Sequence, residues 1–145
     1  MMKTMIIPDI HTKFVLAEKI INREQPDNIV FLGDYFDSYG DSLEITEKTA
    51  LWLKESLDKE NRIHLLGNHD LSYLDPKCAC SGFTKEKFLA IHKIGLDLSR
   101  LVHHCWVGDF LCTHAGLSND FYQKYGDGLD VNDFLQKYSN DKNLR

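Results

Sequence analysis

Three short apolar runs alternate with two stretches of helical periodicity in the first half of the chain. The apolar runs cover residues 4–8, 28–32 and 63–66, and the helical stretches cover residues 14–23 and 43–57, the second with Ser42 as N-cap. A strand–helix–strand–helix–strand order predicts right-handed crossover connections and a largely parallel sheet. We therefore expect an α/β protein.

The second half is less regular. Residues 71–82 contain proline, glycine and two cysteines, which predicts an irregular surface segment. Thr84 is a candidate N-cap for a helix expected to carry its apolar face as far as Leu98, with Gly95 weakening the last turn. A β-hairpin is expected over residues 102–106 and 110–113, followed by short helices over residues 119–125 and 131–138.

The length and charge of the chain narrow the class of protein. It has 145 residues, 43% of them hydrophobic and 27% charged, which predicts a single globular domain over residues 1–145. The net charge of −5 argues against a nucleic-acid partner bound through a broad basic surface. The sequence contains no apolar run of membrane-spanning length and no signal-peptide core, so we expect no membrane association and a cytoplasmic location.

Four cysteines are present, and their spacing differs from that of common zinc-binding motifs. Without a secretory signal, the sequence favours reduced thiols that act mainly as packing residues. A structural zinc site is the less favoured alternative. The four are Cys78, Cys80, Cys105 and Cys112.

Residues of metal-ligand type follow each apolar run and the second hairpin strand. In an open parallel sheet the carboxyl ends of the strands meet at one edge, so these side chains are expected to converge. Close carboxylates repel one another unless a cation lies between them, and mixed nitrogen and oxygen ligands suit manganese, iron or zinc better than calcium. The residues are Asp9 and His11, Asp34 and Asp37, Asn68, His69 and Asp70, and His114.

Each cluster alone has a structural explanation. An Asp-x-His pair, a Gly-Asp turn and an Asn-His-Asp helix cap all occur without metals, and Asp70 is better explained as a structural carboxylate. Four clusters in succession at the ends of strands favour a joint site.

The same residues resemble the successive motifs of the calcineurin-like metallophosphoesterases. The motifs are Asp9-x-His11, Gly33-Asp34-x-x-Asp37, Gly67-Asn68-His69-Asp70 and His114-Ala115-Gly116-Leu117. They are most similar to the branch that contains serine/threonine phosphatases and dinucleoside tetraphosphatases. The resemblance implies a two-sheet sandwich flanked by helices, here shortened at its C-terminal end.

The resemblance also implies the metal ligands. Asp9 and His11 would bind the first divalent ion, Asn68 and His114 would bind the second, and Asp34 would bridge them. The ions would be Mn²⁺, Fe²⁺ or Zn²⁺. They would clamp a phosphoryl group and supply a metal-bound hydroxide as the nucleophile.

Two further residues are assigned to catalysis by the resemblance. His69 would protonate the leaving oxygen, and Asp37 would orient the imidazole and raise its pKa. Expected substrates are phosphorylated small molecules, nucleotides or phosphoproteins.

The sequence departs from the family pattern in three places. Ser38 stands where the protein phosphatases have a phosphate-gripping arginine, Thr12 stands where they have glycine, and no histidine follows His114. We therefore expect a weaker second metal, completed by water, by a neighbouring chain, or by His103 or His104. The alternative function is a degenerate binding scaffold with one metal or none. Retention of the residues assigned to catalysis favours the enzyme.

Overall fold

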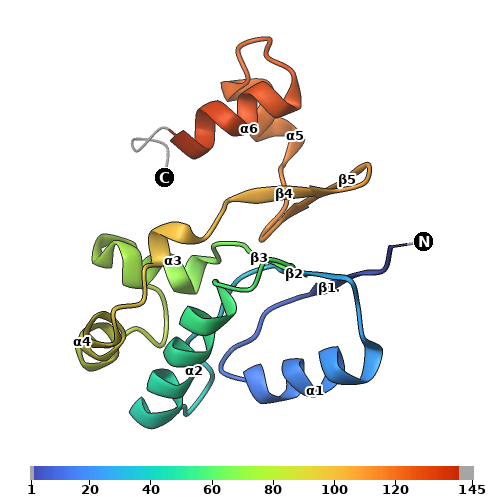
Figure 1. The fold of residues 1–145 in the computed structure, drawn as a ribbon. Helices are drawn as coiled ribbons and strands as arrows, with labels where there is room; N and C mark the ends of the chain where they lie inside the picture. The colour runs from blue at the N-terminus through green and yellow to red at the C-terminus, as the bar shows by residue number, and fades with distance from the viewer. Residues whose placement is uncertain (1, 141–145) are drawn as a thin grey trace.

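The computed structural model describes residues 2–140, and its first half has the predicted α/β order (Figure 1). Three parallel strands form one sheet in the order β1-β2-β3. Their register places Met5 beside Ile29, and Phe31 beside His64. The strands are β1 (Thr4–Ile7), β2 (Asn28–Phe31) and β3 (Arg62–His64).

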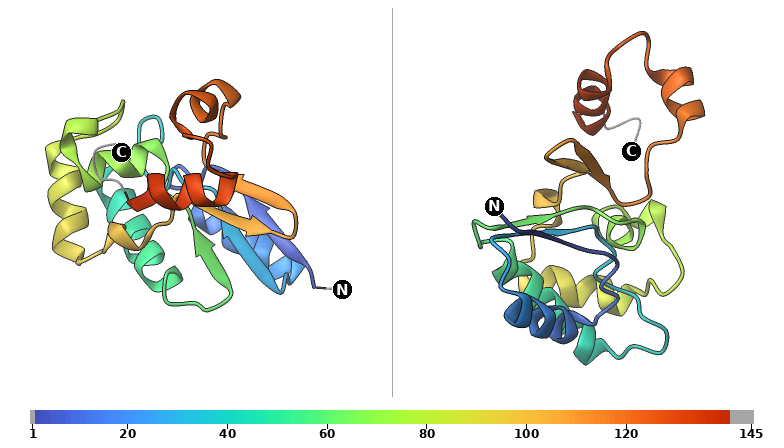
Figure 2. Two further views of the ribbon diagram at one scale, coloured as in Figure 1. Left: turned by 90° about the horizontal axis from the view of Figure 1, so that it is seen from above. Right: turned by 90° about the vertical axis from the view of Figure 1, so that its right-hand side faces the viewer.

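Helices cover one face of this sheet (Figures 1 and 2). They are α1 (Phe14–Glu24) and α2 (Leu43–Ser56), and α4 (Lys85–Ile94) packs against α2 on the side away from α1. As predicted, Ser42 caps α2 by accepting a hydrogen bond from the N–H of Ile45 (3.3 Å), and Thr84 caps α4 in the same way. The main core lies between these helices and the sheet and includes fully buried Phe31 and Leu53.

A two-stranded hairpin lies over the other face of the sheet (Figure 2). Its strands are β4 (His104–Val107) and β5 (Phe110–Thr113), which pair antiparallel with Cys105 opposite Cys112. These cysteines pack against Val30 and Leu65 in a second, smaller core, and burial raises the pKa of Cys105 to about 11. The predicted two-sheet arrangement is confirmed, and the helices α5 (Asn119–Tyr125) and α6 (Val131–Asn140) lie beyond the hairpin.

The prediction of an irregular segment over residues 71–82 was partly wrong. A helix, α3 (Asn68–Leu74), begins inside the third motif and is followed by the 3₁₀ turn η1 (Pro76–Cys78). Asp70, in the first turn of α3, accepts a hydrogen bond from the N–H of Gly67 (2.9 Å), and Tyr73 is fully buried. Local capping and core packing therefore determine this helix.

The predicted extent of α4 was too long. Gly95 adopts a left-handed conformation (φ 71°) and caps the helix, so Leu98 lies in a separate 3₁₀ turn, η2 (Leu98–Arg100). The hairpin also starts later than predicted, because Val102 forms backbone hydrogen bonds with His64 and Leu66 in place of the partner strand. No helix among residues 2–140 is long and apolar enough to cross a membrane.

Candidate metal centre

Four segments bring the predicted ligands to one edge of the sheet. Asp9 and His11 follow β1, Asp34 follows β2, Asn68 begins α3, and His114 follows β5. The first two segments are joined directly, because the carbonyl of Asp34 accepts hydrogen bonds from the N–H groups of Ile10 (3.0 Å) and His11 (2.8 Å). These backbone contacts thus hold the loop after β1 against the loop after β2.

Asp70 joins the second segment to the third. Its fully buried carboxylate accepts hydrogen bonds from the N–H groups of Asp34 (2.8 Å), Tyr35 (2.8 Å) and Gly67 (2.9 Å). Burial raises the pKa of Asp70 to about 7, whereas the backbone donors act in the opposite direction. In return, the N–H of His69 donates to Oδ1 of Asp34 (2.9 Å). Asp70 therefore positions the bridging candidate Asp34, in line with the structural explanation drawn from the sequence.

Glycine is required at two positions for this close approach. A Cβ atom on Gly33 would lie 2.6 Å from the backbone nitrogen of Gly67, and Gly33 has φ +108°. A Cβ atom on Gly67 would lie only 2.2 Å from Oδ1 of Asp34. The two glycines thus allow the second and third segments to touch.

Backbone strain is concentrated in the same place. Positive φ angles occur at His11 (39°), Thr12 (65°), Asp34 (53°) and Asp37 (65°). Such conformations are costly for residues with a side chain and are typical of functional sites. The strained backbone is therefore a second indication that these loops form a site.

The ligand atoms converge on the carboxylate of Asp34. Asp9, Asp34 and His114 offer atoms that all lie within 4.8 Å of one another. Nε2 of His11 lies 3.8 Å from Oδ2 of Asp34 and 3.9 Å from Oδ2 of Asp9. Nε2 of His114 lies 3.5 Å from Oδ2 of Asp34 and 3.0 Å from Oδ1 of Asn68. All five predicted ligands are thus brought together, with Asp34 between the two histidines.

The protonation of the two histidines shows that this donor set fits a cation. Nδ1 of His11 lies 2.8 Å from the carbonyl of Phe36, and Nδ1 of His114 lies 2.9 Å from the carbonyl of Leu32. Because a carbonyl only accepts, each Nδ1 carries the proton and each Nε2 presents a lone pair. In the neutral imidazoles these lone pairs face the Asp34 carboxylate. Acceptors that face one another repel, and a divalent ion between them removes the repulsion.

The catalytic candidates lie beside this cluster. The ring centroid of His69 is 5.2 Å from that of His11, and its Nδ1 is 3.3 Å from Oδ2 of Asp37. The side chain of Asp37 is fully buried, and its other oxygen accepts a hydrogen bond from the hydroxyl of Tyr73 (2.6 Å). The structure thus places the predicted His69–Asp37 pair in contact.

A buried lysine was missed by the reasoning from sequence. Nζ of Lys87 donates to Asp37 (3.0 Å), to Asp41 (2.7 Å) and to the carbonyl of Gly82 (2.9 Å). Burial alone lowers the pKa of Lys87, but hydrogen bonds to Asp41 and Asp37 outweigh it and raise the pKa. The sequence carries no signal for this contact, since a lysine within Lys85-Glu86-Lys87 is typical of a solvated helix face.

Cys80 was also missed as a site residue. The Asn68 side-chain amide donates to Sγ of Cys80 (3.6 Å), and this thiol donates to the Asn68 carbonyl (3.4 Å). These contacts turn Oδ1 of Asn68 toward His114. Of the two histidines considered for the second metal, His103 lines a cavity that Asn68 and His114 also line, and His104 lies 3.5 Å from Oγ of Ser139. Neither belongs to the Asp9–Asp34–His114 cluster.

The fold and this cluster define a class: a two-sheet α/β protein with a candidate metal site at the strand ends. A match to a family model identifies the protein more specifically than this class does. A family model, described as calcineurin-like phosphoesterase, matches residues 2–144, and the chain belongs to this family. The predicted resemblance is confirmed.

A solved structure with a similar fold is a phosphatase. It is described as a protein serine/threonine phosphatase from Saccharomyces cerevisiae with similarity to human phosphatase PP5. The TM-score is 0.57 at 16% sequence identity, and the match covers 99% of this chain and 44% of that chain. The chain therefore spans less than half the length of this neighbour, and the likeness concerns the fold alone. No curated protein sequence matches the chain.

Proposed function

We propose that this protein is a metal-dependent hydrolase of phosphate esters with a dinuclear site. The observation that carries the proposal is the pair of histidine Nε2 atoms, on His11 and His114, that face the carboxylate of Asp34 at 3.8 and 3.5 Å. This arrangement suits two cations that share one carboxylate. We further propose that residues 1–145 form one domain, that the ions are Mn²⁺, Fe²⁺ or Zn²⁺, and that the substrate is a phosphorylated small molecule, nucleotide or phosphoprotein.

Each side chain has a stated part in the proposed reaction. Bound divalent ions supply positive charge to the phosphoryl oxygens and lower the pKa of a coordinated water, so that hydroxide is available near neutral pH. His69 donates a proton to the leaving oxygen, and Asp37 holds its ring through the 3.3 Å contact with Nδ1. Lys87 and Tyr73 occupy the other oxygen of Asp37, which leaves Oδ2 for His69.

The two proposed metal positions differ in their donors. Asp9, His11 and Asp34 supply two carboxylates and an imidazole to the first. Asp34, Asn68 and His114 supply one carboxylate, an imidazole and a neutral amide oxygen to the second. A neutral oxygen binds a divalent ion less strongly than a carboxylate does. The second ion should therefore be the weaker of the two, with water completing its coordination.

Hydrolysis of phenyl phosphate by metal-free and manganese-loaded protein tests the proposal. We expect phosphate release that depends on manganese and is lost in Asp34→Asn. Asp127→Asn is the matched control, because Asp127 is an exposed carboxylate that pairs with Lys137 outside the site. Manganese binding without any hydrolysis would reject the enzyme and support the alternative of a binding scaffold.

A further inference from the structure

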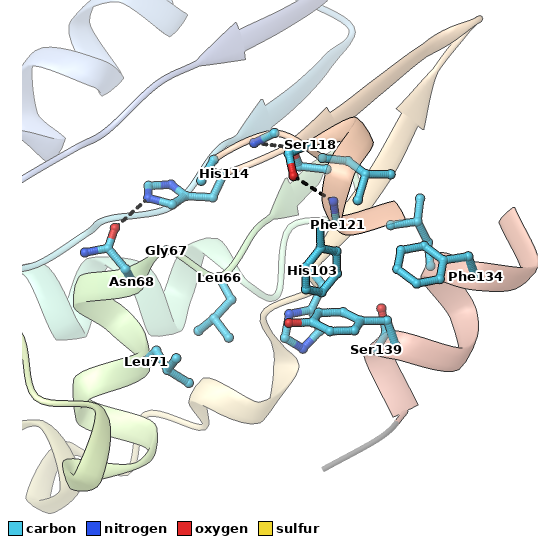
Figure 3. Close-up of a pocket in the computed structure, with 16 residues that line it drawn as sticks. Leu66, Gly67, Asn68, Leu71, His103, His114, Ser118, Phe121, Phe134 and Ser139 are labelled. Atoms are coloured by element: carbon cyan, nitrogen blue, oxygen red, sulfur yellow. Dashed lines mark hydrogen bonds between the residues drawn. The ribbon is translucent and has the colours of Figure 1, made fainter. Parts of the chain in front are cut away.

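A cavity of about 480 Å³ opens directly beside the candidate metal centre. Asn68 and His114, two of the proposed metal ligands, belong to its lining, so the cavity and the centre are continuous. Helix α3, the segment after β5 and the helices α5 and α6 supply the other walls (Figure 3). Its volume is within the range of pockets that bind small molecules.

The cavity changes in polarity along its length. Figure 3 shows Asn68 and His114 at one side, Phe121 and Phe134 at the other, and Leu66 and Leu71 between them. Phe121 lies with its ring 6.0 Å from that of Phe134, in an edge-to-face arrangement. The end nearest the metal centre is therefore polar, whereas the far end is mainly aromatic, with the polar side chains of His103 and Ser139 beside the rings.

The charge of the described lining residues restricts which ligands can bind at the far end of the cavity. No lysine, arginine, aspartate or glutamate is among the described residues that line the cavity. A second phosphate or an acidic peptide would thus lose hydration there without gaining a lysine or arginine as counter-ion. An uncharged ring suits the site, because aromatic walls contact another ring favourably edge-to-face or offset-stacked.

We propose that this cavity binds the aromatic leaving group of a small phosphate monoester. The inference rests on the proposed function and narrows its substrate class. With the phosphoryl group beside Asn68 and His114, the ring extends toward Phe121. Water adds to phosphorus, the bond from phosphorus to the ester oxygen breaks, and that oxygen takes a proton. The products are inorganic phosphate and an alcohol that carries an aromatic ring.

Benzyl phosphate and methyl phosphate test this inference, because their leaving alcohols are similar in basicity and differ in the ring. For the manganese-loaded protein we expect kcat/KM for benzyl phosphate to exceed that for methyl phosphate by roughly 10- to 100-fold, the range for burial of one aromatic ring. Phe121→Ala should reduce this ratio at least about fivefold. Phe110→Ala is the matched control, because Phe110 is 75% exposed at the hairpin tip and lies outside the cavity lining. This variant should keep the wild-type preference for benzyl phosphate over methyl phosphate.

A second variant protects the test against misfolding, because Phe121 also packs against Tyr125 and Tyr138. Ala115→Leu adds volume to an exposed position of the cavity lining and removes no core contact. Ala115→Leu should also lower the ratio of kcat/KM for benzyl phosphate to that for methyl phosphate. An unchanged ratio in both variants would overturn the inference.

Binding of two non-hydrolysable analogues separates the cavity from the chemistry. Calorimetry should show tighter binding of benzylphosphonate than of methylphosphonate, with the difference reduced in Phe121→Ala. Equal kcat/KM for the two esters would overturn the inference and leave the proposed function intact. A preference for benzylphosphonate without hydrolysis of either ester would support the aromatic site and reject the hydrolase. Equal binding of both phosphonates, again without hydrolysis, would reject both.

Discussion

Replacement of Lys87 by methionine should destabilise the protein more than any exposed lysine replacement. Its side chain is 8% exposed, and its ammonium group is the shared partner of Asp37 (0% exposed) and Asp41 (6% exposed). Methionine has a similar volume but no charge. The variant would therefore leave two buried carboxylates without their cation.

The magnitude follows from the burial of the pair. Removal of one partner from a buried ion pair costs about 3–5 kcal/mol, because an uncompensated charge remains in the interior. By contrast, Lys48 pairs with Glu44 on the surface, with side chains 58% and 73% exposed, where solvent screens the pair. We expect Lys87→Met to lose about 3–5 kcal/mol of unfolding free energy and Lys48→Met to lose much less.

Urea denaturation at pH 7 measures both values. The raised pKa of Lys87 means that its contribution is fully present below pH 10.5, the ordinary lysine pKa, and is lost only as pH rises through the higher folded value. The measurement at pH 7 therefore records the whole effect. A loss below about 1 kcal/mol for Lys87→Met, or equal losses in the two variants, would refute the assigned contact.

The remaining predictions concern catalysis, pH and loop packing. His69→Ala should lower kcat for methyl phosphate by roughly 10²–10⁴ and for 4-nitrophenyl phosphate much less, since a good leaving group needs little protonation; equal losses would exclude the acid role. Burial lowers the pKa of His64 to about 3, so unfolding free energy should fall as pH drops from 6.5 toward 3, by up to about 1.4 kcal/mol per pH unit. In His64→Gln the unfolding free energy should depend less steeply on pH, by the equivalent of one proton taken up on unfolding. An identical slope in the variant and the wild type would refute the assignment. Gly67→Ala should lower manganese affinity in calorimetry, because its Cβ would meet Oδ1 of Asp34 at 2.2 Å; wild-type affinity would show that the loops relax freely.

Local signals made much of the fold predictable. Ser42 and Thr84 cap their helices through hydrogen bonds to residues three positions further on, so both helix starts were visible in the sequence. The extent of α4 was not, because the left-handed conformation of Gly95 decides where that helix ends. Likewise, capping and core packing form helix α3, which extends into residues 71–82, where proline and cysteine had predicted an irregular segment.

The candidate site was predictable for a different reason. Ligand-type residues directly follow strands, and a parallel sheet brings those strand ends together. The contacts that support the ligands follow no such rule. Lys87 and Asp37 are fifty positions apart, and Cys80 is twelve positions from Asn68. Only tertiary packing joins them, as it joins α5 and α6 to the cavity beside His114.

Calorimetric titration of the metal-free protein with manganese tests the central claim most directly. Because Asp34 is proposed to contact both ions, the wild-type protein should bind manganese in two unequal steps, and Asp34→Asn should lose or strongly weaken both. Asp127→Asn, with the same chemical change on the surface, should retain both steps. Two equally tight ions would contradict the assignment of Asn68 as a weak ligand, and wild-type manganese binding by Asp34→Asn would contradict the metal centre itself.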